Sequence, residues 1–153
     1  MASFEPTTFD LVIAVDWSAD SKPGPVNPKP DAIWLAFGTR DERPPPEYHR
    51  TRASAIDRIA ALAGSHRGST AVGFDFAFGY PTLPTTCMPT GRDLCRFLAE
   101  RIEDREDNRN NRFEAAQQLN REIAAAHGWS EGPFWGRPAH LDLPNLSPRS
   151  PTQ

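Results

Sequence analysis

The chain has little of what builds cross-links or membrane spans. Cys87 and Cys95 are the only cysteines among its 153 residues, which excludes a disulfide framework and a four-cysteine zinc site. No run of about 18 apolar residues occurs, so no membrane span is expected. Residues 1–10 lack the basic start and apolar stretch of a signal peptide. We therefore expect a cytoplasmic protein that has no membrane partner.

Positive charge and the common phosphate-binding signatures are also missing. The net charge is −3, so no overall positive field attracts nucleic acid, although a local patch is still compatible with this value. The sequence has neither a Gly-x-x-x-x-Gly-Lys-Ser/Thr loop nor a Gly-x-Gly-x-x-Gly fingerprint. It has no Gly-x-Ser-x-Gly nucleophile elbow, and its four histidines lack metal-ligand spacing. These observations argue against P-loop, dinucleotide-binding and serine-hydrolase classes.

The length and the proline distribution indicate one domain followed by a tail. A chain of 153 residues is long enough for a single core. Its 16 prolines gather near residues 23–30, in 44–46 and beyond 133, where they favour loops over regular elements. We predict a single domain over residues 1–137. Residues 138–153 show no periodicity and are expected to be extended or disordered.

The hydrophobic pattern predicts an α/β fold with a mixed sheet. Nearly continuous apolar runs indicate buried strands, and stripes at helical spacing indicate amphipathic helices. The expected elements are strands at 9–15 and 31–38, an edge strand near 47–50, a helix at 51–63, a strand at 70–76, and helices at 92–102 and 112–127. The helix before the fourth strand makes a right-handed crossover to a strand parallel to the first the natural connection.

Two aspartates end the two most apolar strands. Asp16 follows Leu11–Val15, and Asp75 follows Ala71–Phe74. Because the carboxyl ends of adjacent parallel strands meet at one edge of a sheet, both carboxylates are expected at one place, where ligands bind in open α/β sheets. Their oxygens would suit Mg²⁺ or Mn²⁺. The structural alternative is that each aspartate only caps the loop that follows it.

A polar junction between the two last helices is the second candidate. Residues 104–114 mix acids with arginines and asparagines, and arginine can hold phosphate through two hydrogen bonds. Asn111, Arg112 and Glu114 are the candidate substrate-binding residues. Asn110 or Asn111 is expected to cap the following helix, with Glu114 completing a capping box. The alternative is a solvated, salt-bridged turn.

An aromatic loop is the third candidate. Phe134 and Trp135 lie between Gly132 and Gly136. An exposed Trp135 could stack against a base or sugar of a ligand. The alternative is that these aromatic side chains close the edge of a core.

Four segments together resemble a bacterial family of uncharacterised proteins. They are Val12–Ala19, Val72–Pro81, Asn108–Glu114 and Gly132–Gly136. The resemblance covers roughly residues 9–148. The family is similar to proteins with a ribonuclease-H-like fold, and some relatives carry a cobalamin-biosynthesis name, for which this sequence offers no supporting motif.

The resemblance implies the N-terminal part of a ribonuclease-H-like three-layer fold. That fold begins with a strand meander, a helix and a strand parallel to the first, and Asp16 and Asp75 match its first two acidic positions. Family members are longer, and nucleases of this fold take a further carboxylate from a late helix. The resemblance therefore implies a truncated chain, or half of a split protein, with an incomplete metal site.

Three functions stay open on this basis. The leading hypothesis is a metal-dependent phosphodiester hydrolase that uses Mg²⁺ or Mn²⁺ at Asp16 and Asp75, with nucleic acid or another phosphate-containing ligand as its partner. The second is a non-catalytic interaction module or truncated remnant that pairs with a second copy or with the missing C-terminal half. The third is a phosphotransferase of the actin-like superfamily, which would need duplicated domains and glycine-rich phosphate turns.

Overall fold

The chain folds into two compact units. The computed structural model describes residues 8–75 and 91–149. The first unit comprises Met1–Phe76 with Arg105–Arg109, and the second comprises Ala77–Asp104 with Asn110–Gln153. The single domain expected over residues 1–137 stays a prediction. The expected end of the strand at Phe76, the segment 78–81, Cys87 and the last residues of the tail lie outside the described residues.

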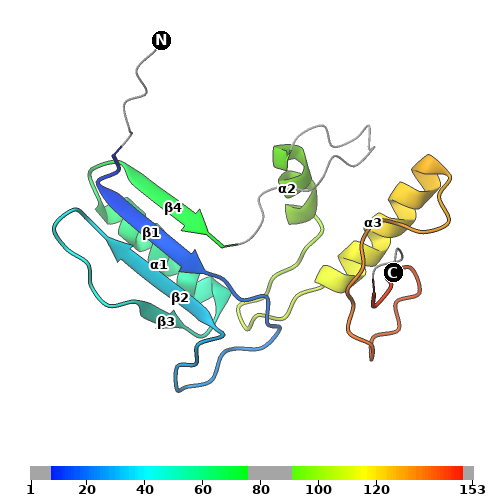
Figure 1. The fold of residues 1–153 in the computed structure, drawn as a ribbon, viewed down its shortest axis with the longest axis horizontal. Coiled ribbons are helices and arrows are strands. Elements are labelled where there is room, and N and C mark those ends of the chain that lie inside the picture. Colours follow the sequence, from blue (N-terminus) through cyan, green and yellow to red (C-terminus); the bar gives the residue numbers. More distant parts are fainter. Residues whose placement is uncertain (1–7, 76–90, 150–153) are drawn as a thin grey trace, which may run out of the picture. The chain divides into compact units, whose positions relative to one another are not determined.

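The first unit is built on a four-stranded mixed sheet in the order β3-β2-β1-β4 (Figure 1). Strand β1 pairs antiparallel with β2 and parallel with β4, while β3 pairs antiparallel with β2. The strands are β1 Leu11–Asp16, β2 Ile33–Gly38, β3 Glu47–His49 and β4 Thr70–Phe74. The mixed sheet, the edge position of β3 and the parallel crossover to β4 confirm the α/β prediction.

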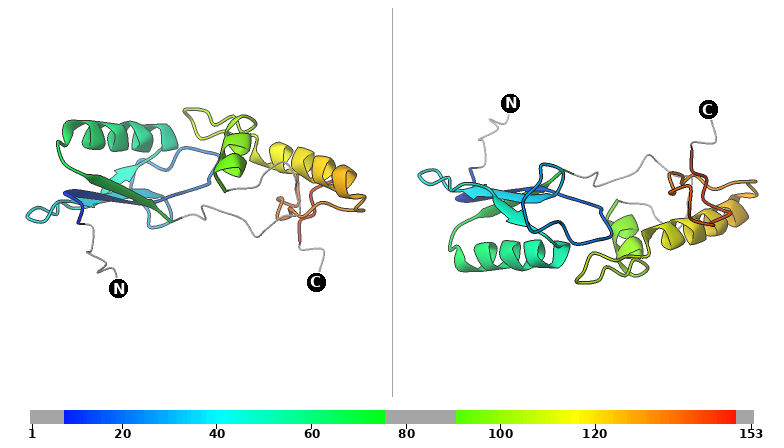
Figure 2. Two further views of the ribbon diagram at one scale, coloured as in Figure 1. Left: turned by 90° about the horizontal axis from the view of Figure 1, so that it is seen from above. Right: turned by 90° about the horizontal axis from the view of Figure 1, so that it is seen from below.

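One face of this sheet carries the core. Side chains of β1 alternate between buried and exposed, so Leu11, Ile13 and Val15 point to one side. Helix α1 (Arg52–Ser65) lies along that side (Figure 2) and packs Ile59 and Leu62 against it. The side chain of Thr51 caps the helix by accepting a hydrogen bond from the Ser54 amide.

A side-chain clasp fixes the start of the parallel pair. Asp10 precedes β1 and Ser69 precedes β4. The Asp10 Oδ2 atom accepts hydrogen bonds from the Ser69 amide at 2.7 Å and from the Ser69 hydroxyl at 2.8 Å. These bonds hold the pKa of Asp10 below its ordinary value. The clasp joins residues 59 positions apart and so supports the register in which Leu11 faces Thr70.

A buried asparagine secures the other loops of the first unit. Asn108 is 1% exposed and has a left-handed backbone with φ of 69°. Its Oδ1 accepts from the Arg52 amide, and its Nδ2 donates to the carbonyls of Lys22 and Arg50. Residues 105–109 therefore tie the proline-rich loop after β1 to the beginning of α1.

The Arg52 side chain extends the same network. It is 5% exposed, and its guanidinium donates to the carbonyls of Ser18, Asp20 and Asn108 at 2.6–3.0 Å. Buried polar groups need such partners because leaving one unsatisfied costs about 1–3 kcal/mol. The Arg52 guanidinium thus holds the long loop after β1 by donating hydrogen bonds to its backbone carbonyls.

The second unit contains two helices and an irregular segment. Helix α2 spans Gly91–Ala99 and helix α3 spans Arg112–His127. Gly128 follows α3 in a left-handed conformation and forms its C-cap. No helix among the described residues is long and apolar enough to cross a membrane. Residues 138–149 form no helix or strand, but Leu146 is 1% exposed and packs into this unit.

The predicted capping box of α3 is wrong. Asn111 occupies the N-cap position, but its side chain makes no capping hydrogen bond. Its Oδ1 instead accepts from the Glu103 amide at 2.8 Å, and its Nδ2 donates to the Arg101 carbonyl. The side chain of Asn111 therefore binds the preceding turn instead of the first turn of α3. The Oδ1 of Asn110 accepts from the Arg112 amide at 3.3 Å in its place.

Asn108 offers a test of the loop anchor. We expect Asn108→Gly to lower the free energy of unfolding by about 1–3 kcal/mol. The buried Arg52 amide loses its partner, and the partly buried carbonyls of Lys22 and Arg50 each lose one hydrogen bond, while glycine still permits the positive φ. Urea unfolding followed by tryptophan fluorescence measures the change. The matched control is Asn27→Gly in the exposed part of the same loop, which should shift stability by less than about 0.5 kcal/mol. Equal effects in both variants would contradict the anchoring role.

Candidate functional site

The two predicted aspartates lie at one edge of the sheet. Asp16 is the last residue of β1, and Asp75 directly follows β4. The parallel register pairs Val15 with Phe74, the residues just before them, and the Asp75 amide donates to the Val15 carbonyl at 3.3 Å. Both side chains are exposed. The prediction that Asp16 and Asp75 end neighbouring parallel strands is confirmed.

Asp75 also links the carboxyl ends of β1 and β4. Its Oδ1 accepts a hydrogen bond from the Trp17 amide at 2.8 Å. This contact is the counterpart of the Asp10–Ser69 clasp at the other end of β1. The Trp17 ring packs edge-on against Phe74, with centroids 5.6 Å apart, which fixes the backbone that carries Asp16 and Asp75. Asp75 thus has a structural role, whatever else it does.

The local electrostatics disfavour a charged Asp16. Desolvation by the surrounding protein, the neighbouring Asp75 carboxyl group and the charge of Asp31 hold the pKa of Asp16 above its ordinary value. Asp75 lies near enough to exchange a hydrogen bond with protonated Asp16, while Asp31 acts through its charge alone. Asp31, just before β2, is thus a third acidic group that was not predicted from the sequence.

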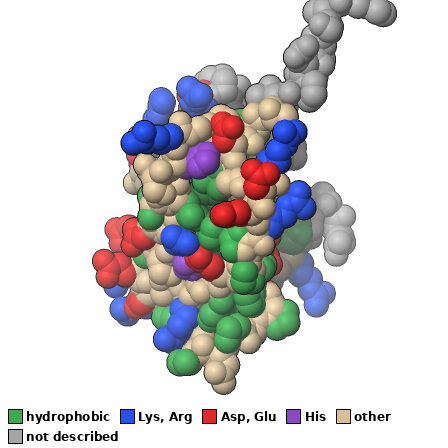
Figure 3. Space-filling model, turned by 90° about the vertical axis from the view of Figure 1, so that its left-hand side faces the viewer, with side chains coloured by type: hydrophobic (Ala, Val, Ile, Leu, Met, Phe, Trp, Pro, Cys, Tyr) green, Lys and Arg blue, Asp and Glu red, His purple; other side chains and the backbone are tan. Residues whose placement is uncertain are grey.

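An apolar hollow adjoins the aspartates on the sheet face opposite α1. Ala14, Ala36 and Gly73 lie beside one another on three adjacent strands and form its floor. Trp34 and Pro46 contribute to its lining, and its volume is about 550 Å³. Figure 3 views the first unit from its other end, where β1 begins, and shows hydrophobic side chains among acidic and basic ones there. A small-residue floor leaves room for a ligand or a second polypeptide.

The other predicted site residues belong to the second unit. Asn111 holds the turn before α3, and the guanidinium of Arg112 lies over the Phe113 ring at 4.5 Å. Glu114 is exposed in the first turn of α3. Trp135 is 57% exposed, and its backbone pairs with Ser147. That these four residues form one site with Asp16 and Asp75 stays a prediction.

Two asparagines are buried although the sequence did not predict a structural role for either of them. Asn108 stands in a charged junction typical of a solvated turn, and the exposed ion pair of Asp107 with Arg109 fits that interpretation. Asn120 is 2% exposed within the apolar stripe of α3. The position of Asn120 among apolar residues of the helix could have predicted its role, because a buried side-chain amide needs hydrogen-bond partners.

The chain gives no significant match when it is compared with protein-family models, with curated proteins and with solved structures. The family resemblance therefore stays an expectation, and the site must be judged on its own geometry.

The donor set at Asp16 and Asp75 fits a divalent cation. Mg²⁺ is commonly held by one or two carboxylates and completes its shell with water and substrate phosphate. Desolvation and the neighbouring Asp75 raise the pKa of Asp16, and a cation between the two carboxylates would offset the charge of Asp75. Among residues 8–75 and 91–149, no group of three or more His, Cys, Asp or Glu side chains is arranged to hold a metal. A cation at this place would therefore have two carboxylate ligands from the protein and would take its other ligands from water.

The coupling of the two carboxyl groups predicts a titration result. Asp75→Asn should lower the pKa of Asp16, because the neutral amide removes a negative charge while its oxygen can still accept from the Trp17 amide. Carbon-detected NMR titration of the Asp16 carboxyl group measures this. Asp31→Asn should lower the same pKa less, because Asp31 acts only through its charge. An unchanged Asp16 titration in Asp75→Asn would refute the coupling.

The same coupling fixes the sign of the stability change with pH. The folded chain holds the Asp16 proton more tightly than the unfolded chain does. The contribution of Asp16 to the free energy of unfolding therefore falls as the pH rises from the ordinary value of 3.8 through the raised folded pKa. The change should be below about 1 kcal/mol, because exposed charges are well screened by solvent.

Proposed function

We propose that this protein is a divalent-cation-dependent phosphodiester hydrolase of ribonuclease-H-like type, in which Asp16 and Asp75 hold Mg²⁺ or Mn²⁺. The observation that carries the proposal is the meeting of these two carboxyl groups at the ends of adjacent parallel strands. Ligand sites in open α/β sheets lie at this edge.

The topology gives further support. A meander of β1, β2 and β3, a crossover through α1 and a parallel β4 beside β1 are the opening elements expected of the ribonuclease-H-like fold. Aspartates at the ends of β1 and β4 are the first two acidic positions that the resemblance implies. The agreement concerns both order and position, which makes it more specific than a pair of acidic residues alone.

In the proposed reaction, the cation and the two aspartates would have separate roles. A bound cation would lower the pKa of a coordinated water and stabilise negative charge on a phosphodiester oxygen. Asp16 and Asp75 would supply its carboxylate ligands. The Trp17 amide holds the Asp75 carboxylate in place through Oδ1. A substrate phosphate would supply a further oxygen ligand.

Metal titration tests the site directly. We expect Mn²⁺ to broaden the NMR signals of residues at the ends of β1 and β4, and Mg²⁺ to bind with measurable heat in calorimetry. Asp16→Asn and Asp75→Asn should each weaken binding at least about tenfold, because each removes one of two charged ligands. Asp41→Asn is the matched control, since Asp41 is an exposed acid elsewhere in the same unit.

Three outcomes separate the parts of the proposal. No binding of either cation to the unaltered chain would overturn the site itself. Cation binding without Mn²⁺-dependent cleavage of bis(p-nitrophenyl) phosphate or of nucleic acid would overturn the hydrolase assignment and leave a binding site. Cleavage that persists in Asp16→Asn would place the reaction elsewhere.

The open sheet face favours a second candidate, a non-catalytic module that pairs with a second copy of the chain. Val12 is 50% exposed on the face opposite the core, next to the floor of Ala14 and Ala36. Exposed apolar surface of this kind often marks an interface.

Sedimentation distinguishes this candidate from the first. If the face pairs copies, the chain should associate as its concentration rises, and Val12→Asp should abolish association. Val26→Asp is the control, because Val26 is 77% exposed in the loop after β1 and lies outside the hollow. A compact monomer that binds no apolar dye at any concentration would exclude the interaction module.

A further inference from the structure

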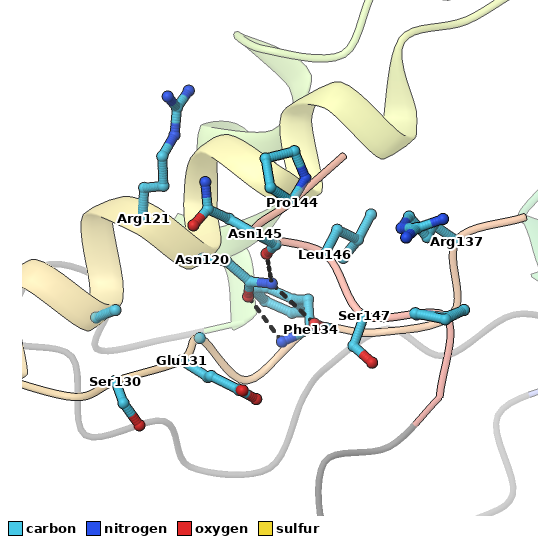
Figure 4. Close-up of a pocket in the computed structure, with 13 residues that line it drawn as sticks. Asn120, Arg121, Ser130, Glu131, Phe134, Arg137, Pro144, Asn145, Leu146 and Ser147 are labelled. Carbon is cyan, nitrogen blue, oxygen red and sulfur yellow. Dashed lines mark hydrogen bonds between the residues drawn. The ribbon is translucent and has the colours of Figure 1, made fainter. Parts of the chain in front are cut away.

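The second unit contains a cavity of its own. It has a volume of about 430 Å³ and lies between α3 and the irregular segments on either side of Arg137 (Figure 4). This volume falls within the range of about 300–1,000 Å³ that is typical of small-molecule sites. The cavity is distinct from the aspartate pair, which belongs to the first unit.

Asn120 builds the walls of this cavity. Its Nδ2 donates to the carbonyls of Phe134 and Asn145, and its Oδ1 accepts from the Phe134 amide, all at 2.7–2.8 Å (Figure 4). A side chain at Gly132 would collide with Asn120, so the aromatic loop can approach α3 only because this residue is glycine. The buried amide thus holds the two irregular walls against one helix.

Arg137 is the unusual group in the lining. It is half-buried, and its Nη1 donates to the carbonyls of Pro138, Ala139 and Leu141. Its Nε is buried with no hydrogen-bond partner among the described residues. The three carbonyls orient the guanidinium and use one of its nitrogens, but they carry no charge that could neutralise it.

The guanidinium of Arg137 therefore has carbonyl partners but no counter-ion among the described residues. Within the described part of the chain, no carboxylate forms an ion pair with it. The lining holds a second cation, Arg121, against a single acid, Glu131, and both of these are exposed. A partly desolvated cation without a counter-ion is unfavourable, and a bound anion would offset that cost.

We propose that this cavity binds a small organic oxyanion, a carboxylate or a phosphate ester, with Arg137 as its anchor. A guanidinium is always charged and donates hydrogen bonds to both kinds of oxyanion. Phe134, Pro144 and Leu146 give the cavity an apolar portion that suits the carbon part of such a ligand. The second unit is thus a binding module for a small anion, and this role does not depend on the function proposed for Asp16 and Asp75.

NMR titration of the full chain tests the proposal with benzoate and phenyl phosphate as probes and neutral benzamide as their comparison. EDTA is present throughout, so that no cation at Asp16 and Asp75 contributes. We expect at least one of the two anions to shift the amide signals of Phe134 and Ser147 in a saturable way, while benzamide does not. Whichever anion binds identifies a carboxylate or a phosphate as the preferred group.

Variants show whether Arg137 is the anchor. Arg137→Gln should weaken binding about tenfold or more, and Arg137→Lys should weaken it less, because lysine keeps the charge but not the planar fork. Ala124→Leu should block binding by filling the cavity while it leaves every hydrogen bond of Arg137 intact. The matched control, Arg149→Gln, removes an exposed charge outside the lining and should bind as the unaltered chain does.

Three results would overturn the proposal. They are the absence of saturable binding for both anions, equal binding of benzamide, and undiminished binding in Ala124→Leu. The last of these stays decisive even where Arg137→Gln disturbs the turn that its Nη1 holds together.

Discussion

The parallel pairing of β1 with β4 is the constraint on which the first unit depends. It joins segments nearly 60 residues apart, and the core face of the sheet forms only when the register is correct. An aspartate secures each end, Asp10 through Ser69 and Asp75 through the Trp17 amide. The second of these contacts fixes the position of Asp75 beside Asp16, so the bond that sets the register also assembles the candidate site.

Buried asparagines do the corresponding work in the irregular parts of the chain. Asn108 joins the loop after β1 to the start of α1, and Asn120 joins α3 to the segments around Phe134 and Asn145. In both, one amide oxygen and one amide nitrogen satisfy backbone groups that have no helix or sheet partner. Such loops can then be well packed without regular secondary structure, and in the second unit they enclose a cavity.

Several elements followed directly from local sequence. The apolar runs at 9–15 and 70–76 predicted β1 and β4, and the apolar stripes at helical spacing predicted α1 and α3, because both patterns depend on residues close in the chain. The capping role given to Asn111 failed for the opposite reason. Its side chain had a competing partner in the Glu103 amide, eight residues away, which no local rule anticipates.

The sequence by itself determined the order of strands and helices and the two strands that end in aspartate, because these properties reside in periodicity and in single residue types. Only the tertiary structure decided that Asp31 adds its charge to the Asp16 environment and that Asn108 is buried. The same holds for Arg137, which lines a cavity without a counter-ion. The physical reason is that burial, electrostatic coupling and satisfied hydrogen bonds are properties of groups distant in the chain, which become neighbours only when the chain folds.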